Sequence, residues 1–342
     1  MSRRAVFRAD ASVAIGGGHV RRCLVLAEAL RAAGWQCVFA CRPDTRRAVP
    51  ALAGAGHRVV EIAGPDTESP ARIAAEIGKC DLLVVDHYGL DAAFEHACRD
   101  WADRILVLDD CADRDHDADL LLDPTLGRLE ADYGKRVPDA CRLLLGPAYA
   151  LLRSGFAELR PGVLAARRFD GPVGRILVTL GTADPDNVTA VVLEGLAKAG
   201  TGAAVDVVLG GAAPHLRKIK ALASSLPIEV DVHTEVEDMA AMMASADFAI
   251  GAAGSTVWER CCLGLPGLVT VIADNQRLIA ASLGAAGGAH SLGPHGELTV
   301  AKVAAAFRDL DGDPAARAAM SARAATICDG LGAGRVLAET TT

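Results

Sequence analysis

Short apolar runs alternate with longer amphipathic stretches along most of the chain. In the first half, several of the apolar runs end in Asp or Gly. Short apolar runs separated by helix-length segments are typical of buried parallel strands whose carboxyl ends lie at one edge of a sheet. We therefore predict a helix over 19–34, ending at a glycine, and strands over 5–8, 36–41, 58–63, 81–86, 104–110 and 119–123.

A second series of apolar runs follows an interruption in this pattern. Residues 159–174 show no regular hydrophobic periodicity and are rich in Pro, Gly and Arg, so we expect an interdomain linker there. A chain of 342 residues is too long for one ordinary core. The fold predicted is α/β, with two tandem Rossmann-like domains facing each other across a cleft. The N-terminal domain would span 1–158 and the C-terminal domain 175–342, with strands over 175–181, 204–211, 228–233, 247–254 and 267–273.

Composition narrows the class of protein. The chain is 51% hydrophobic and 23% charged, with a net charge of −8, which argues against disorder and against a large nucleic-acid footprint. It has no apolar stretch of about 18 residues, so we expect no membrane span, and we recognise no signal peptide. Its ten cysteines are scattered without a CxxC pair, which favours reduced thiols and a cytoplasmic location.

The segment "VAIGGGHVRRC" places three glycines between the first predicted strand and the first helix. Glycine permits a tight turn and a close backbone approach to a ligand. However, Arg21 stands where a dinucleotide-binding loop needs its third glycine, and Arg21–Arg22 is not the Lys-Ser/Thr of a P-loop. An anion site and a plain turn therefore both stay open. His19 follows Gly18 at the helix entry, where it could be a general base or a helix cap.

Polar groups also follow strands in the second half. Ser255 and Thr256, after Gly254, would stand at a helix N-terminus, where backbone N–H groups suit a diphosphate. Glu259 lies one turn later and could reach a ribose. Asn275, Gln276 and Thr182 follow other strands at the same expected edge, although capping or turn chemistry explains each of these positions equally simply.

Acidic residues are dense in "DHYGLD" and "LDDCADRDHDADLLLDP". The calcium-loop order fails there, and the chain has no HxH or HExxH spacing, so we expect no metal and no cofactor. Most of these acids would be solvated or internally hydrogen-bonded. Asp86, Asp109 and Asp110 stand at predicted strand ends and are better site candidates.

In order, these segments resemble a known family along nearly the whole chain. "FRADASVAIGGGHVRRCLVLAEAL", "VVDHYGLD", "VLDDCADRDHDADLLLDP", "LLGPAYALLR" and "AGSTVWERCCLGLPGLVTVIADNQ" are similar to the UDP-2,4-diacetamido-2,4,6-trideoxy-β-L-altropyranose hydrolases of pseudaminic acid biosynthesis. WERCCLGLP followed by ADNQ is the most specific part. The resemblance implies the two-domain fold of the lipid-II-forming N-acetylglucosaminyltransferase, called GT-B.

The resemblance also implies roles for individual residues. His19 matches the proton acceptor, flanked by Asp10 and Arg22. The loop Gly254–Ser255–Thr256 would hold the diphosphate, Glu259 the ribose, and Asn275 and Gln276 the sugar or phosphate side. The segment 234–240 would meet uracil through backbone groups near Val236 and Met239. The substrate-binding residues expected are Asp10, Gly18, Arg22, Tyr88, Thr182, Val236, Met239, Gly254, Ser255, Thr256, Glu259, Asn275 and Gln276.

The activity implied is removal of UDP by water attack at the anomeric carbon, with C–O cleavage and inversion. If His19 keeps a pKa near 6.5, activity should fall below that pH. We expect a monomer acting on a small UDP-sugar. A glycosyltransferase of the same fold, a hydrolysing 2-epimerase of UDP-diacetamido sugars and a non-catalytic nucleotide-sugar binder are the alternatives. Leu180 and Ala253 stand where the family usually has glycine, which leaves the approach of the backbone to phosphate open.

Overall fold

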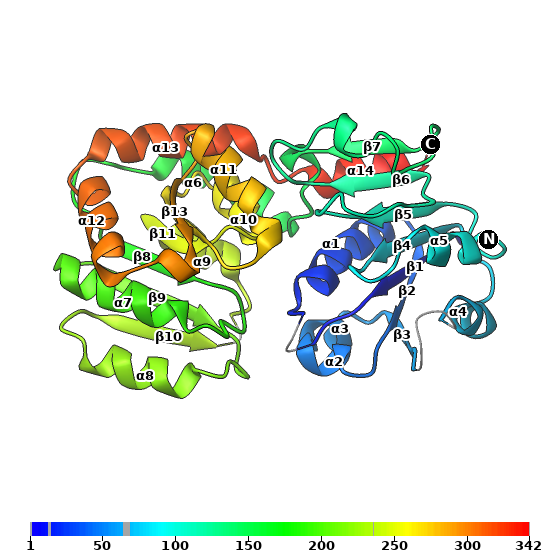
Figure 1. The fold of residues 1–342 in the computed structure, drawn as a ribbon, viewed down its shortest axis with the longest axis horizontal. Helices are drawn as coiled ribbons and strands as arrows, with labels where there is room; N and C mark the ends of the chain where they lie inside the picture. The colour runs from blue at the N-terminus through cyan, green and yellow to red at the C-terminus, as the bar shows by residue number, and fades with distance from the viewer. Residues whose placement is uncertain (1, 13–14, 64–68, 235, 342) are drawn as a thin grey trace. The chain divides into compact units, whose positions relative to one another are not determined.

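The chain contains two β-sheets, each made of parallel strands and each in its own compact unit (Figure 1). The computed structural model describes residues 2–12, 15–63, 69–234 and 236–341. Unit 1 consists of Met1–Leu152 and Leu331–Thr342, and unit 2 of Arg153–Gly330. No helix in these described ranges combines the length and the apolar character that crossing a membrane requires.

Unit 1 is built on a seven-stranded parallel sheet in the order β3-β2-β1-β4-β5-β6-β7. Its strands are β1 Arg4–Ala9, β2 Gln36–Cys41, β3 Arg58–Glu61, β4 Leu82–Asp86, β5 Ile105–Leu108, β6 Leu120–Asp123 and β7 Arg142–Leu145. Its helices are α1 Gly18–Ala32, α2 Thr45–Ala48, α3 Pro50–Gly54, α4 Ser69–Ile77, α5 Ala92–Cys98 and α14 Gly332–Thr341, with short 3₁₀ turns at Glu130–Asp132 and Pro147–Tyr149.

Side chains of both faces of this sheet are buried. Phe7 of β1 stacks on Phe39 of β2 with ring centroids 4.8 Å apart, in the cluster that also takes Leu26 of α1. Val6, the neighbour of Phe7 in sequence, belongs to the cluster on the opposite face. Alternation between two cores explains why these strands are continuously apolar in sequence.

Unit 2 repeats the architecture with a six-stranded sheet in the order β10-β9-β8-β11-β12-β13, also parallel. The strands are β8 Arg175–Thr179, β9 Ala204–Leu209, β10 Val230–Thr234, β11 Phe248–Ala252, β12 Gly267–Val271 and β13 His290–Pro294. The helices are α6 Ser154–Ala166, α7 Val188–Ala199, α8 Leu216–Ser225, α9 Met239–Ser245, α10 Thr256–Cys262, α11 Arg277–Ala285, α12 Val300–Asp311 and α13 Pro314–Ile327, with 3₁₀ turns at Asp274–Gln276 and His295–Glu297.

The predicted strands are all present, most of them shorter at their carboxyl ends than expected. Two strands were not predicted, β7 and β13, and each forms an edge of its sheet. An edge strand has a neighbour on one side only, and most residues of these two remain partly or fully exposed. Their sequences therefore lack the continuous apolar run that marks the central strands.

The expected linker over 159–174 is corrected by the structure, because its first half belongs to helix α6. Helix α6 packs within unit 2 partly through arginines rather than an apolar stripe. Arg160 donates to the carbonyls of Cys262, Ala325 and Cys328, and Arg167 to those of Leu263, Ala246 and Met243. A helix attached in this way shows little hydrophobic periodicity, which is why the sequence pattern indicated a linker.

The end of the chain also departs from the expected C-terminal domain of 175–342. Helix α14 packs on α1 in unit 1, with Val336 buried in the cluster of Phe7 and Leu26. The Glu339 carboxylate accepts a hydrogen bond from Arg142 Nη2 at 2.7 Å, and Arg335 donates to the carbonyl of Ala148. The last helix thus belongs to the first unit.

Candidate functional site

The candidate catalytic group of unit 1 forms where three neighbouring strands end. Strands β1, β4 and β5 are adjacent in the sheet, and parallel strands bring their carboxyl ends to one edge. His19 enters from the helix after β1, Asp86 ends β4 and Tyr88 follows it, and Asp110 comes two residues after β5. Sequence positions nearly one hundred residues apart therefore meet in one cluster.

His19 forms a hydrogen bond with Asp86, the last residue of β4. Nδ1 of His19 lies 2.7 Å from Asp86 Oδ1 and 3.1 Å from the Asp86 carbonyl oxygen. Because a carboxylate accepts, Nδ1 carries the proton and donates it, which leaves Nε2 as the basic nitrogen of the neutral ring. The side chain is 10% exposed. The structure thus supports the general-base hypothesis for His19 more than the helix-cap alternative.

The pKa of His19 is shifted by two opposing effects. Burial lowers the pKa, whereas the charge of Asp86 and the hydrogen bond to it raise the pKa, and the net change is upward. The imidazole therefore binds its proton more tightly than a free histidine, because a fully buried carboxylate faces it.

Arg22 lies one turn after His19 on α1 and pairs with the same carboxylate. Its Nε is 2.6 Å from Asp86 Oδ2 and its Nη2 is 2.6 Å from Asp86 Oδ1, a bidentate pair. The third nitrogen, Nη1, lies 3.1 Å from Asp110 Oδ2. Burial raises the pKa of Asp86, but Arg22 and His19 hold it well below its usual range. Arg22, expected to bind substrate, here fixes the carboxylate behind the histidine.

Tyr88 packs edge-on against His19. The two ring centroids are 4.4 Å apart with an interplanar angle of 88°. The Tyr88 hydroxyl donates to Asp110 Oδ2 at 3.4 Å. Burial and the neighbouring carboxylate raise the pKa of this phenol, so it stays protonated at neutral pH. Tyr88 as a whole is 40% exposed, which lets it meet a ligand beside the imidazole.

Asp10 belongs to a different set of contacts from the one expected. Its carboxylate accepts from the backbone N–H of Arg42 at 2.7 Å and lies 2.7 Å from Arg8 Nη1 and 3.4 Å from His87 Nε2. Burial raises its pKa, but these partners lower it to about 2. Asp10 is 4% exposed, and its side chain anchors the loops around the strand ends instead of flanking His19 directly.

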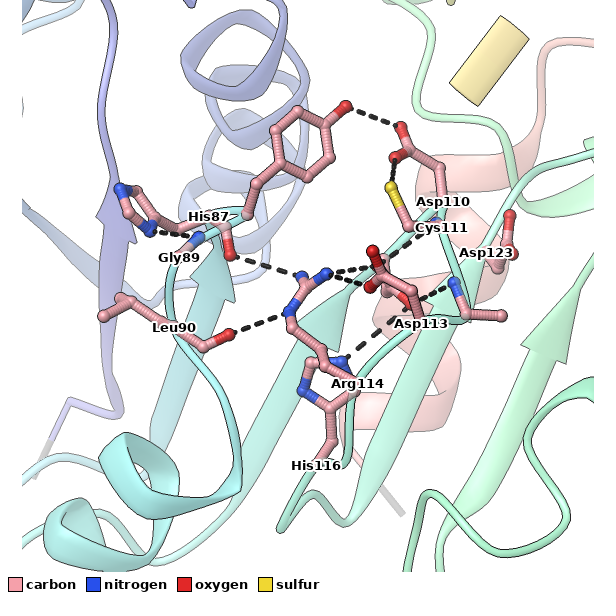
Figure 2. A network of polar contacts seen from close by, with 12 residues as sticks. His87, Gly89, Leu90, Asp110, Cys111, Asp113, Arg114, His116 and Asp123 are labelled. Carbon is pink, nitrogen blue, oxygen red and sulfur yellow. Dashed lines mark hydrogen bonds and ion pairs between the residues drawn. The ribbon is translucent and has the colours of Figure 1, made fainter. Parts of the chain in front are cut away.

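A second arginine joins the loops after β4 and β5 (Figure 2). Arg114 donates to the carbonyls of Leu90 and His87 and pairs with Asp109 at 3.2 Å and with Asp113 at 3.0 Å. This network ties the segment that carries Tyr88 to the segment that carries Asp110.

Asp109, Asp110 and Cys111 lie close enough to share a metal ion, with ligand atoms within 4.8 Å of one another. Their surroundings do not suit one. Arg114 and Arg22 already pair with the two carboxylates. Burial and the nearby carboxylates raise the pKa of Cys111 to about 12, so its thiol is protonated and a poor ligand.

In unit 2, the loop between β11 and α10 carries Gly254, Ser255 and Thr256. Ser255 is the N-cap residue of α10 and is exposed, and its side chain makes no capping hydrogen bond. Oε1 of Gln276 accepts from the Ile272 N–H at 3.1 Å, and its Nε2 would lie 3.5 Å from a Cβ placed on Gly254. The structure therefore brings Gln276 beside the Gly254 loop, from the end of the adjacent strand.

Two other candidates of unit 2 are Glu259 and Asn275. Glu259 lies four residues after Ser255 on α10, and Asn275 lies in the 3₁₀ turn after β12; both are half-buried. Ala253 is fully buried and Leu180 likewise, and neither is among the non-glycine residues of positive φ in the described chain. Leu180 and Ala253 thus adopt backbone conformations that do not require glycine, whereas Gly181, next to Leu180, has a positive φ of 86°.

The remaining candidates of unit 2 lie at other strand ends. Thr182 is exposed after β8, and its carbonyl accepts from the Gly210 N–H at 2.8 Å. The carboxylate of Asp184 accepts the N–H groups of Val188 and Thr189 at 2.9 and 3.0 Å, so an internal anion already caps helix α7. This arrangement weakens the case for a phosphate at Thr182.

The expected uracil contacts lie at the start of α9. Met239 is the first residue of that helix, Val236 precedes it, and both are half-buried. Asp238 caps the helix by accepting from the Ala241 N–H at 2.8 Å. Glu235, within the expected 234–240 segment, lies outside the described residues.

Comparisons with known proteins identify the architecture of the chain. Residues 175–330 match the glycosyltransferase family 28 C-terminal domain. The structure is similar to that of MurG of Acinetobacter baumannii, with a TM-score of 0.69 and 16% identity. The match covers 99% of this chain and 99% of that one. The chain has the GT-B fold. The UDP-GlcNAc 2-epimerase of Neisseria meningitidis shares this GT-B fold with a TM-score of 0.63 and 15% identity, covering 100% of this chain and 99% of that one.

Three proteins are similar in sequence. The UDP-2,4-diacetamido-2,4,6-trideoxy-β-L-altropyranose hydrolase of Campylobacter jejuni is 26% identical over 261 residues, 76% of this chain and 88% of that protein. The spore coat polysaccharide biosynthesis protein SpsG of Bacillus subtilis is 27% identical over 296 residues, 83% of this chain and 82% of that protein. An uncharacterized protein of Methanocaldococcus jannaschii is 25% identical over 78% of this chain, and the match spans 55% of its length.

The expected GT-B architecture is therefore confirmed, and so is a distant relationship to the hydrolase. Sequence reasoning named Asp86 and Asp110 only as acids at strand ends. The available signal was their position at the carboxyl ends of the strands predicted over 81–86 and 104–110. Their pairing with His19 and Arg22 could not be read from spacing, because it depends on the order of strands in the sheet.

Proposed function

We propose that the chain is a hydrolase that removes UDP from UDP-2,4-diacetamido-2,4,6-trideoxy-β-L-altropyranose by attack of water at the anomeric carbon. The C–O bond to UDP breaks, the configuration inverts, and the products are UDP and the free sugar of the pseudaminic acid route. The similarity to the C. jejuni hydrolase supports the substrate class.

The His19–Asp86 pair carries this proposal. Asp86 holds the proton on Nδ1, so Nε2 is free to accept a proton from water as the new C–O bond forms. The same carboxylate stabilises the imidazolium that results. UDP is a good leaving group, so a hydrolase of this kind needs a base more than a strong acid.

The residues of unit 2 are proposed to bind the UDP moiety. Gly254, Ser255 and Thr256 would contact the diphosphate, with Gln276 beside them, and Glu259 the ribose. Val236 and Met239 would contact uracil through backbone groups. The match of residues 175–330 to the family 28 C-terminal domain supports a nucleotide-sugar role for this unit.

Hydrolysis in oxygen-18 water tests the proposal. The protein is incubated with the UDP-sugar and no acceptor, and UDP release and the position of the label are followed by NMR and mass spectrometry. We expect acceptor-independent UDP release with the label in the sugar. Label in UDP would mean attack at phosphorus and would overturn the scheme.

A glycosyltransferase is the second candidate, because residues 175–330 match a glycosyltransferase domain and the fold is shared with MurG. A transferase would release UDP only when an acceptor is present. The fold is also shared with UDP-GlcNAc 2-epimerases. A hydrolysing epimerase would be distinguished by the configuration of the product at C2.

A further inference from the structure

The imidazole of His19 is one member of a closed ring of side-chain contacts. His19 contacts Asp86 through Nδ1, and Asp86 is held on both oxygens by Arg22. Arg22 continues to Asp110 through Nη1, and the same Asp110 oxygen, Oδ2, accepts from the Tyr88 hydroxyl. The Tyr88 ring then returns to His19 edge-on at 4.4 Å. Asp110 is the member on which the two arms of the ring converge.

We propose that Asp110 is a positioning residue for the His19 imidazole, acting through Arg22 and Tyr88. The inference rests on the proposed role of His19 as the base and adds a residue to it. Asp110 contacts Arg22 and Tyr88, so its influence on His19 passes through these two neighbours.

The geometry explains why both arms matter. A guanidinium is planar, and two hydrogen bonds to Asp86 together with one to Asp110 fix its orientation in its own plane. That orientation decides where the Asp86 carboxylate meets Nδ1. On the other side, the hydrogen bond from Tyr88 to Asp110 restrains the phenol ring that packs on the imidazole. The location of Nε2 is thereby set from two directions.

The charges around the imidazole also connect Asp110 with His19. The groups facing the imidazole are Asp86 and Tyr88 from the end of β4 and Arg22 from its own helix, with Asp110 and Cys111 behind them at the end of β5. The positive charge of Arg22 lowers the pKa of His19. Asp110 pairs with Arg22 and offsets part of that charge. Removing the Asp110 charge should therefore lower the pKa of His19.

Asp110→Asn is the test, and Asp113→Asn is the matched control. Asp113 lies in the same loop and undergoes the same change of charge, but its side chain is 66% exposed and pairs with Arg114. The His19 ring is titrated by NMR in the free protein, with its signals assigned from a His19→Gln sample. In Asp110→Asn the titration midpoint should fall by about half a unit or more, and the Nδ1–H tautomer should be less populated. Asp113→Asn should leave both unchanged.

An unchanged titration and tautomer in folded Asp110→Asn would overturn the proposal. Tyr88→Phe provides a second route if Asp110→Asn does not fold, since it removes only the hydroxyl that bonds Asp110. Its His19 Cε1–Hε1 signal should shift, because a ring 4.4 Å away moves relative to the imidazole. An unshifted signal would count equally against the proposal.

Activity separates this proposal from the proposed function. With a wild-type enzyme that hydrolyses the UDP-sugar, Asp110→Asn should lower kcat roughly 10-fold with KM nearly unchanged, and its acidic pH limb should move to lower pH. If Asp110 had only a structural role, its substitution would lower the amount of active protein without moving the acidic limb of the pH profile. If the wild type hydrolyses no UDP-diacetamido sugar, the proposed function fails, while the NMR titration still decides the role of Asp110.

Discussion

Nδ1 of His19 lies 2.7 Å from Oδ1 of Asp86, and the two come from segments of the chain 67 residues apart. Asp86 is fully buried and His19 is 8% exposed. A carboxylate behind an imidazole orients the ring, selects the Nδ1–H tautomer and favours the protonated form. These three effects determine what the site can do and lead to the expectations below.

Replacement of His19 by Asn should leave nucleotide binding intact and lower turnover roughly 10²–10⁴-fold, because the proton acceptor is lost. UDP release from the UDP-sugar measures turnover, and calorimetric titration with UDP measures binding. His96→Asn is the control, since that side chain is 83% exposed and pairs with Asp117. Near-normal turnover in His19→Asn would reduce His19 to a structural residue.

Replacement of Asp86 by Asn should affect both turnover and stability. Turnover should fall roughly 10²-fold or more, because the amide no longer stabilises the imidazolium. The change also leaves Arg22 without its bidentate partner, so we expect a loss of about 3–5 kcal/mol in the free energy of unfolding. Urea denaturation measures the latter. If Asp86→Asn were as stable as the wild type, the ion pair between Asp86 and Arg22 would not stabilise the fold as expected.

The pH dependence of activity follows from the raised pKa of His19. A base acts in its neutral form, so activity should fall as the pH drops through this raised value. The acidic limb of kcat/KM should then lie above about 6.5, the value of an unperturbed histidine. A limb at or below that pH would argue against His19 as the base.

Stability should depend on pH in the same region. The folded pKa of His19 is raised, so its contribution is fully present below about 6.5 and is lost as the pH rises through the folded value. The folded pKa of Asp86 is lowered, so its contribution is present above about 3.9 and is lost at more acidic pH. The stability difference between wild type and His19→Asn should therefore be larger at pH 5.5 than at pH 9. Urea unfolding at both values checks the sign.

Alanine substitutions at two glycines of unit 2 distinguish an effect on stability from an effect on UDP binding. A Cβ on Gly251 would lie 2.6 Å from the Thr179 carbonyl oxygen and 2.8 Å from Arg260 Nη1, so Gly251→Ala should cost about 1–3 kcal/mol of stability. Among the described residues, a Cβ on Gly254 would come within 4 Å only of Gln276 Nε2, at 3.5 Å. Gly254→Ala should melt like the wild type yet bind UDP more weakly. Unchanged UDP affinity would remove Gly254 from the proposed diphosphate site.

Arg160 provides a test of the corrected linker. It donates to three carbonyls at the ends of other segments of unit 2, so Arg160→Met should lower the unfolding free energy by about 1.5–3 kcal/mol. Arg168→Met is the control, because Arg168 is exposed and donates to the carbonyls of Ala165 and Arg167, which precede it closely in the chain. Equal stability of the two variants would mean that α6 is loosely attached.

Much of the architecture was determined by sequence alone. Runs such as 36–41 and 267–271 are buried on both faces, and that burial is what makes them continuously apolar and recognisable as parallel strands. His19 was also identifiable, because a histidine beside glycines at a strand–helix junction lies at the edge where parallel strands end.

Tertiary structure alone decided which groups surround that histidine. Strand order brings β1, β4 and β5 together, so Asp86 and Asp110 join His19 while Asp10, only nine residues from His19, turns to Arg8 and Arg42 instead. It likewise decided that helix α14 returns to unit 1. Local patterns record burial and turn geometry at each position. They do not record which distant segment supplies the partner, and the charge and hydrogen bonds of that partner set the chemistry.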